Sequence, residues 1–166
     1  MRRLVLDASV LLSAPVGRPE SPPSLLVEAA RSGAFEMIAC ETLFGEFERG
    51  LEGRYFRDRV RDPERALLSA MVRGIATVFP DPESPPPVVR DPADDYLVAL
   101  ARTADADAIV TGDRDLLNHE GLEPPAVTPR DACAQLDLLE ESAAWAWRSW
   151  WGREPAPYPG PGGEPS

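Results

Sequence analysis

Short apolar runs alternate with helix-length segments along most of this chain, and this alternation constrains the fold more than any other feature. The runs have the length and the apolar content of buried strands. They cover residues 2–7, 35–39, 75–79, 108–111 and 126–128. Strands that are separated by helices predict right-handed crossovers and a parallel sheet that is covered on both faces. We therefore expect an α/β fold with three layers, α/β/α, around a central parallel sheet.

Helix signals lie between these runs. Ser21, Pro22 and Pro23 open one helix, which should end before Gly33, because proline suits the first turn and glycine ends helices. The other expected helices cover residues 41–51, 63–73, 93–104 and 128–141. The proline-rich stretch 80–92 is expected to be a loop, since proline interrupts both helices and central strands.

The chain has 166 residues, which suits one domain with a tail. We expect the domain to span residues 1–141. The tail, residues 142–166, gathers tryptophans at positions 145, 147, 150 and 151 and then becomes rich in proline and glycine, so we expect it to be partly disordered. The tryptophans suit packing against the domain, which we favour, or a surface for a dimer or another partner.

Composition excludes several kinds of active site. All 17 basic side chains are arginines, which excludes a catalytic lysine. The single histidine, His119, excludes sites with several imidazole ligands, argues against a Ser-His-Asp triad, and is expected at the surface. Cys40 and Cys133 are expected to be reduced thiols of a cytoplasmic protein. We find no signal peptide and no run long enough to cross a membrane.

The net charge of −11 by itself argues against a nucleic-acid partner, since phosphate contacts need cations. Divalent cations held by carboxylates would reverse the local sign, and an acidic surface also suits a basic protein partner. Residues 49–73 are the one locally basic stretch. An ion-paired helical face is slightly favoured there over an RNA groove in which Tyr55 and Phe56 stack on bases.

Acidic residues gather where the expected strands end. Asp7 closes the first strand, and Asp113 and Asp115 follow the fourth strand. Asp95 begins the helix that precedes the fourth strand. Because parallel sheets bind ligands beyond the carboxyl ends of their strands, these acids should meet at one edge.

Glu46 lies in the expected helix 41–51, on or beside the face marked by Leu43, Phe47 and Leu51. A carboxylate there costs several kcal/mol unless it is paired or bound to a metal. Divalent ions would relieve the mutual repulsion of converging carboxylates, and oxygen ligands favour Mg²⁺ or Mn²⁺ over Zn²⁺. Such ions serve phosphoryl transfer.

Each acid also has a purely structural interpretation. Asp7 could be a turn residue, and acids at 94, 95, 113 and 115 could cap helices or favour their first turns. Glu46 could pair with an arginine. We prefer the shared site, because several such coincidences at one edge of one sheet are less frequent than any one alone.

Three segments together resemble the PIN domain. The first is Leu4-Val5-Leu6-Asp7-Ala8-Ser9-Val10-Leu11, the second is the helix that begins in Arg90-Asp91-Pro92-Ala93-Asp94-Asp95-Tyr96, and the third is Thr111-Gly112-Asp113-Arg114-Asp115. Their order and spacing agree over about residues 1–138, and the chain most resembles the VapC-like toxins of toxin–antitoxin pairs.

The resemblance implies a site of four acids, Asp7, Glu46, Asp95 and Asp113, that hold Mg²⁺ or Mn²⁺, with Asp115 as an accessory metal-binding acid. Asp94 is the competing choice for the third acid, and Asp95 is preferred because Ala99 follows it on the packed face. Ser9 and Thr111 would be hydroxyls that orient a carboxylate or water.

The implied activity is endonucleolytic hydrolysis of RNA. The partners implied by the resemblance are an RNA substrate and a cognate antitoxin that places an arginine among the acids. The tryptophan cluster allows a second copy of the chain as a further partner, and we expect no membrane association. Two alternatives stay open. One is a non-catalytic PIN-like scaffold, and the other is another Mg²⁺-dependent phosphohydrolase, against which Ser9 argues because a haloacid-dehalogenase-like site needs a second aspartate there.

Overall fold

The computed structural model describes residues 2–83, 85, 87–89 and 92–139. Its centre is a five-stranded sheet in the order β3-β2-β1-β4-β5, and every pair of neighbouring strands is parallel. The strands are β1 (Arg2–Leu6), β2 (Phe35–Ala39), β3 (Ala76–Val78), β4 (Ala108–Val110) and β5 (Ala126–Val127). The α/β fold with a central parallel sheet is confirmed, and each expected strand lies within two residues of its predicted bounds.

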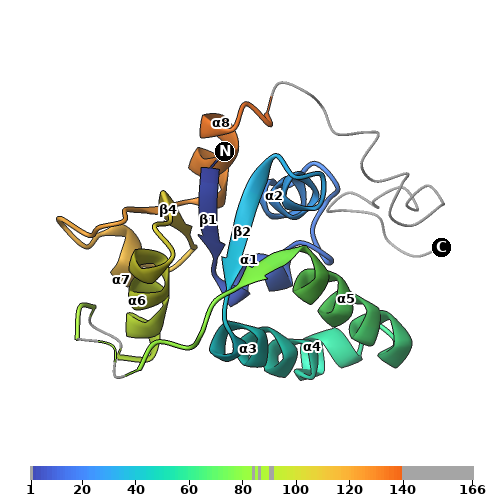
Figure 1. The fold of residues 1–166 in the computed structure, drawn as a ribbon. Helices are drawn as coiled ribbons and strands as arrows, with labels where there is room; N and C mark the ends of the chain where they lie inside the picture. Colours follow the sequence, from blue (N-terminus) through green and yellow to red (C-terminus); the bar gives the residue numbers. More distant parts are fainter. Residues whose placement is uncertain (1, 84, 86, 90–91, 140–166) are drawn as a thin grey trace.

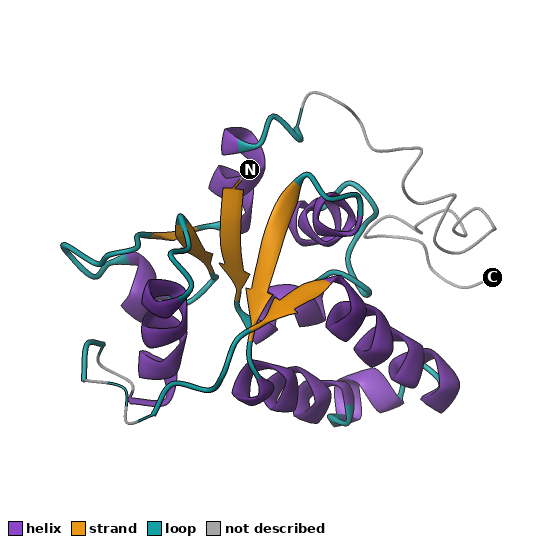
Figure 2. Ribbon diagram, viewed as in Figure 1, coloured by secondary structure: helices purple, strands orange, loops and turns teal. Residues whose placement is uncertain are grey.

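Helices connect and cover the strands (Figures 1 and 2). They are α1 (Ala8–Ser13), α2 (Pro22–Arg31), α3 (Glu41–Leu51), α4 (Arg54–Arg57), α5 (Asp62–Ile75), α6 (Asp95–Thr103), α7 (Arg114–Leu117) and α8 (Pro129–Gln135). A 3₁₀ turn, Pro92–Asp94, leads directly into α6. The long helices thus follow the predicted ones, and α1 and α4 are short additions.

The sheet is covered on both faces. α2 packs on β2 and against α8, whereas α6 packs on β1 and β4. In Figure 1, α6 and α2 lie on opposite sides of β1 and β2. This arrangement follows from right-handed crossovers, because the chain moves outward from β1 to β3 and then returns past β1 to reach β4.

The core is built on the middle of the sheet. Val5 lies opposite Ile38 of β2 and Ile109 of β4, and all three side chains are 0% exposed. A strand that is buried on both faces has apolar residues at consecutive positions and no alternation with polar ones. Continuous apolar runs in the sequence therefore predict these strands.

The chain departs from prediction at α8, which ends at Gln135 and not near residue 141. Asp137 has a left-handed backbone, with φ of 58°, and the Leu138 N–H donates to the Cys133 carbonyl at 2.9 Å. This is a helix-ending bond pattern, and aspartate tolerates the left-handed conformation. The tryptophan-rich tail, residues 142–166, lies outside the described residues.

Gly33 ends α2 as expected, with a φ of 78° that a side chain would strain. Cys40 and Cys133 are free, buried thiols, and burial raises the pKa of Cys40 to about 12. Among the described residues, no helix is long and apolar enough to span a membrane.

Candidate active site

The candidate site lies at the carboxyl edge of the sheet, where β1 runs between β2 and β4. The connection from β1 leads to one side and the chain reaches β4 on the other side. A parallel α/β sheet has a crevice beyond its strand ends at such a switch in direction. Asp7 follows β1 directly, and its N–H donates to the Val110 carbonyl at the end of β4 at 3.0 Å. The ends of the two strands are therefore tied together.

A buried hydroxyl connects the acids that follow these two strands. Thr111, directly after β4, is 0% exposed, and its Oγ1 donates to Asp7 Oδ2 at 2.6 Å. The same Oγ1 accepts the Asp113 N–H at 3.0 Å. Thr111 thus fixes Asp7 and the backbone of Asp113 relative to each other, as expected for a hydroxyl that orients a carboxylate.

Ser9 also holds Asp7. Its hydroxyl donates to Asp7 Oδ2 at 2.8 Å, and its N–H donates to Oδ1 at 3.2 Å, which caps α1. The two hydroxyls therefore share one carboxylate oxygen. A carboxylate has about four acceptor positions, so Oδ1 retains capacity for a further ligand. The expected role of Ser9 and the structural role of Asp7 as a cap are both present.

A cavity of about 550 Å³ opens at this edge. Its lining residues are Asp7, Ser9, Val10, Ser13, Pro23, Asp94, Gly112, Asp113 and Pro129. Carboxylates therefore reach it from three separate segments, namely the end of β1, the start of α6 and the segment after β4. None of these lining residues is basic, so the cavity carries a strongly negative charge.

Asp95, the residue preferred from the sequence as the third acid, does not line this cavity. It is 3% exposed, and its Oδ1 accepts the N–H groups of Val88 and Val89 at 2.7 and 2.9 Å. Asp95 does not reach the cavity because it lies on the packed face of α6, as Ala99 does. On that face its carboxylate points toward the end of the proline-rich loop. Asp94, one residue earlier, faces the cavity.

His119 holds the same loop from the other side. Its Nε2 lies 2.9 Å from the Val88 carbonyl, and its Nδ1 is buried without a hydrogen-bond partner among the described residues. His119 is therefore half-buried, with one ring nitrogen buried, and is not a fully exposed surface residue. Asp95 thus accepts the Val88 N–H, and His119 contacts the Val88 carbonyl. Together they hold the end of the proline-rich loop near the start of α6.

Glu46 does not line the cavity, and its side chain is instead hydrogen-bonded to Tyr96 of α6. It lies mid-way along α3, is half-buried, and accepts a 2.5 Å hydrogen bond from the Tyr96 hydroxyl. Burial, this bond and the nearby carboxylates of Glu46 and Asp7 raise the pKa of Tyr96 well above its usual value. The hydrogen bond places the Tyr96 hydroxyl beside Glu46, and Tyr96 follows the cavity-lining Asp94 by two residues.

Asp113 and Asp115 lie at the start of α7. The Asp113 carboxylate accepts the Asp115 N–H at 2.7 Å and caps this short helix, so the structural interpretation holds for Asp113 alongside its place in the cavity. Asp115 is exposed and does not line the cavity.

The donor set suits a hard divalent cation, because the cavity carries carboxylate and hydroxyl oxygens and neither a thiol nor an imidazole. Within the described part of the chain, no three acidic, histidine or cysteine side chains lie close enough together to form a metal-binding group. The acids therefore line one cavity but do not form a closed ligand shell. A bound cation would draw their carboxylates together.

The basic stretch 49–73 is largely neutralised by neighbouring acids. Arg65 is buried and pairs with Glu52 and Asp62, and Arg61 pairs with Glu64.

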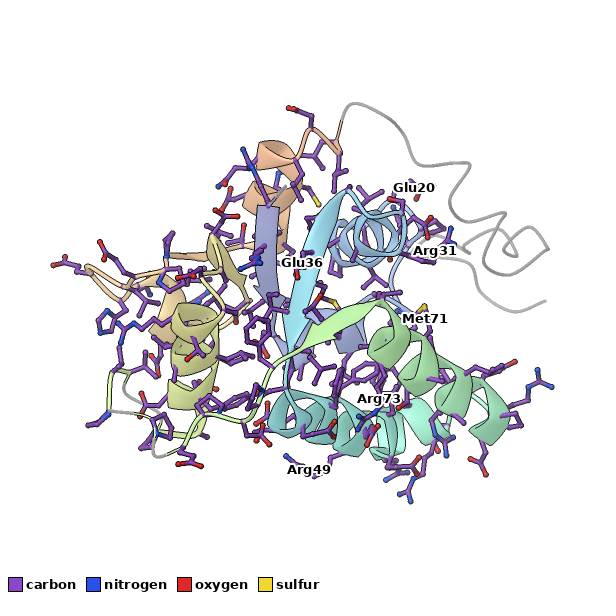
Figure 3. All side chains as sticks on the ribbon, in the orientation of Figure 1. Glu20, Arg31, Glu36, Arg49, Met71 and Arg73 are labelled. Atoms are coloured by element: carbon purple, nitrogen blue, oxygen red, sulfur yellow. The ribbon has the colours of Figure 1, made fainter. Side chains whose placement is uncertain are left out.

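Arg73 extends from α5 to α3, where it pairs with Glu41 and Glu48 and lies 4.3 Å from the Phe44 ring centroid (Figure 3). Arg49 instead lies at the outer margin of α3 in the same view. Arg54 also pairs with Asp58, so the ion-paired interpretation of this stretch accounts for four of its arginines. Phe56 is buried, whereas Tyr55 is exposed.

Sequence reasoning did not single out Tyr96 or the loop-holding role of His119. A tyrosine in a helix with apolar neighbours has the pattern of a core residue, and only its position next to two acids hinted at a polar contact.

Comparison with known proteins agrees with this geometry. The PIN domain family model matches residues 3–115. Among solved structures, the chain is similar to PAE2754 from Pyrobaculum aerophilum, with a TM-score of 0.58 and 16% identity over 82% of this chain and 90% of that chain. At this identity the likeness concerns the fold alone. A comparison with curated proteins gave no match. Since the family match covers more than half of the chain, the protein belongs to the PIN-domain family, whose members are mostly metal-dependent nucleases.

Proposed function

We propose that this protein is an endoribonuclease that depends on Mg²⁺ or Mn²⁺ and hydrolyses RNA phosphodiester bonds. The observation that carries the proposal is the meeting of Asp7, Asp94 and Asp113 in one cavity at the carboxyl edge of the sheet. Such carboxylates repel one another, and a divalent cation is the ordinary means of stabilising them together.

Asp7, Asp94 and Asp113 are the residues we propose as metal ligands, with Glu46 at the margin of the site. This replaces Asp95 by Asp94, because the Asp95 carboxylate is committed to the backbone of Val88 and Val89. A bound divalent cation supplies charge neutralisation at the phosphate and makes a water molecule more acidic.

The chain's own residues prepare this site. Thr111 and Ser9 donate to the same oxygen of Asp7, which leaves the other oxygen as the one available to a ligand. Thr111 also sets the position of Asp113. Water adds to phosphorus as the bond to the 3′ oxygen breaks, and no covalent intermediate with the protein is needed.

We further propose that the protein is the toxin of a toxin–antitoxin pair. An acidic cavity with no basic lining residue suits an inhibitor that inserts an arginine among the carboxylates. The net charge of −11 also suits a basic partner. The partner proposed is therefore a small basic protein, and a second copy of this chain is a further candidate.

The test is cleavage of a single-stranded RNA by the full chain with Mn²⁺ and with a chelator. We expect cleavage only with the metal, and loss of at least about 100-fold of the rate in Asp7→Asn. Asp105→Asn is the matched control, since Asp105 is exposed, lies outside the cavity, and has a left-handed backbone that asparagine also adopts. Equal cleavage by the wild type and Asp7→Asn would remove Asp7 from the reaction.

The toxin role has a separate test in growing cells. Expression of the wild-type chain should halt growth, and expression of Asp7→Asn should not. Normal growth with the active wild-type enzyme present would contradict the toxin role and leave the nuclease proposal standing. Absence of RNA cleavage together with absence of Mn²⁺ binding would favour the non-catalytic scaffold.

A further inference from the structure

Tyr96 connects α3 to the start of α6, two residues after the cavity-lining Asp94. It is the second residue of α6, it is 7% exposed, and its hydroxyl donates to Glu46 Oε2 on α3 at 2.5 Å. Asp7, at the end of β1, also acts electrostatically on this phenol. The contact therefore joins two helices that are 50 residues apart in the sequence at the edge where Asp7 lies.

The start of α6 gives each of three consecutive residues a different task. Asp94 faces the cavity, Asp95 binds the backbone of the proline-rich loop, and Tyr96 binds Glu46. Successive residues point in directions about 120° apart in the 3₁₀ turn that ends at Asp94 and about 100° apart in α6, so these three side chains can meet three different neighbours. The position of α6 therefore sets the Asp94 carboxylate and, through Tyr96, the Glu46 carboxylate together.

In the hydrogen bond between Tyr96 and Glu46, Tyr96 is the donor and Glu46 is the acceptor. The phenol is protonated at neutral pH, because the ordinary pKa of tyrosine is about 10. It can therefore only donate its proton to Glu46, and a hydrogen bond from a neutral donor to a carboxylate is short and strong. The bond occupies one position on Oε2 and leaves Oε1 and the remaining lone pair of Oε2 as acceptors.

We propose that Tyr96 is a positioning residue, which holds the Glu46 carboxylate at the site through its hydroxyl group so that Glu46 contributes to divalent cation binding. This inference rests on the proposed function. Partners that orient a ligand in this way typically account for about 10–100-fold in metal affinity.

The experiment is calorimetric titration of Mn²⁺ into the full chain without RNA, for the wild type, Tyr96→Phe, Glu46→Gln and the double variant. We expect Tyr96→Phe to weaken Mn²⁺ binding by about 10–100-fold. Because Tyr96 acts through Glu46, the double variant should bind no more weakly than Glu46→Gln. Tyr55→Phe is the matched control, since this exposed tyrosine lies on α4 away from the cavity, and it should bind as the wild type does.

Wild-type affinity or tighter binding in Tyr96→Phe would overturn the inference, and so would fully additive effects in the double variant. Thermal melting without metal is measured first, because Tyr96→Phe keeps the buried ring and should remain folded. If it does not, Glu46→Gln with Tyr96 intact decides the matter, since unchanged Mn²⁺ affinity would mean that Tyr96 has no ligand to position.

Failure of the proposed function looks different. In that case the wild type itself would show no Mn²⁺ binding that depends on Asp7, and the inference would fall with it. If the wild type binds Mn²⁺ and Asp7→Asn does not, an unchanged Tyr96→Phe contradicts the positioning role alone.

Discussion

Adjacent carboxylates at the start of α6 lie in different surroundings. Asp94 lines the acidic cavity, whereas Asp95 is 3% exposed and accepts two backbone N–H groups of the proline-rich loop. Two aspartates that are adjacent in the sequence therefore make different contacts, one at the cavity and one with the loop backbone.

Asparagine substitutions should separate these two tasks. Asp94→Asn is expected to reduce metal-dependent RNA cleavage strongly while the melting temperature without metal stays near that of the wild type. Asp95→Asn is expected to lower the free energy of unfolding by about 1–2 kcal/mol, because the hydrogen bonds to Val88 and Val89 lose their charge assistance. Urea unfolding and RNA cleavage of both variants check this, and the reverse pattern would restore Asp95 as the third acid.

Thr111 provides a second test at the scale of one hydroxyl. Thr111→Val keeps the shape of the side chain but removes the group that donates to Asp7 and accepts from Asp113. We expect the free energy of unfolding to fall by about 1–3 kcal/mol and metal affinity to weaken by about 10–100-fold. Thr103→Val, at an exposed position on α6, is the control for the substitution itself, and an equal effect of both would contradict the role of Thr111.

The sequence could identify the acids but not the register at the start of α6. Asp94 closes a 3₁₀ turn and Asp95 begins the α-helix, so the rotation per residue changes at this point. A helical periodicity extended backward from Ala99 correctly predicted that Asp95 is on the packed side. It could not show that the packed side there is the loop at Val88, a contact that depends on tertiary structure.

At the scale of elements, α3 begins without a capping side chain of its own. Its N-cap residue is Cys40, and the Thr42 N–H is instead satisfied by Asp81 Oδ1 of the proline-rich loop at 2.8 Å. The loop therefore supports α3, which carries Glu46, at one end and meets Asp95 at the other. A segment without regular structure is in this way tied to both helices that deliver acids.

Asp81→Ala should remove this cap and lower the free energy of unfolding by about 1 kcal/mol at pH 7. The hydrogen bond from Thr42 lowers the pKa of Asp81, so its stabilising contribution is complete above the usual value of about 3.9 and is lost as the pH falls through the lower folded value. The difference between the wild type and the variant should therefore shrink between pH 5 and about pH 2.

Urea unfolding across this pH range measures the difference. Glu83→Ala is the control from the same loop, since Glu83 is exposed, and it should show no such trend. A difference between wild type and Asp81→Ala that is constant with pH would contradict the capping role.

The longer elements were predictable because their signals are local. The five strands, of which β1, β2 and β4 are mostly buried, and the helices α2, α3, α5 and α6 follow from apolar runs, helical spacing, and proline and glycine at helix ends. The short helices α1 and α4 carry few residues, and the early end of α8 depends on the left-handed backbone of Asp137. Such features are decided by a few hydrogen bonds that no periodicity reveals.

At the scale of the whole molecule, the fold gathers negative charge at one edge of the sheet in a protein whose net charge is already −11. The unbound protein therefore keeps unfavourable carboxylate repulsion at its site. Binding of a divalent cation should relieve it and stabilise the whole domain.

Mn²⁺ should accordingly raise the melting temperature in proportion to the logarithm of its concentration. At a free concentration 100 times the Kd, the gain in free energy of unfolding should be about 2.7 kcal/mol. Asp7→Asn should show a much smaller gain, and Asp105→Asn should behave as the wild type does. A gain of the same size in Asp7→Asn would locate the stabilising ion elsewhere.

The most direct test of the central claim is the anomalous scattering of Mn²⁺ in crystals of the wild-type chain. We expect a peak in the cavity at about 2.2 Å from carboxylate oxygens of Asp7 and of at least one of Asp94 and Asp113. Crystals grown at saturating Mn²⁺ that show no peak between these side chains would contradict the central claim.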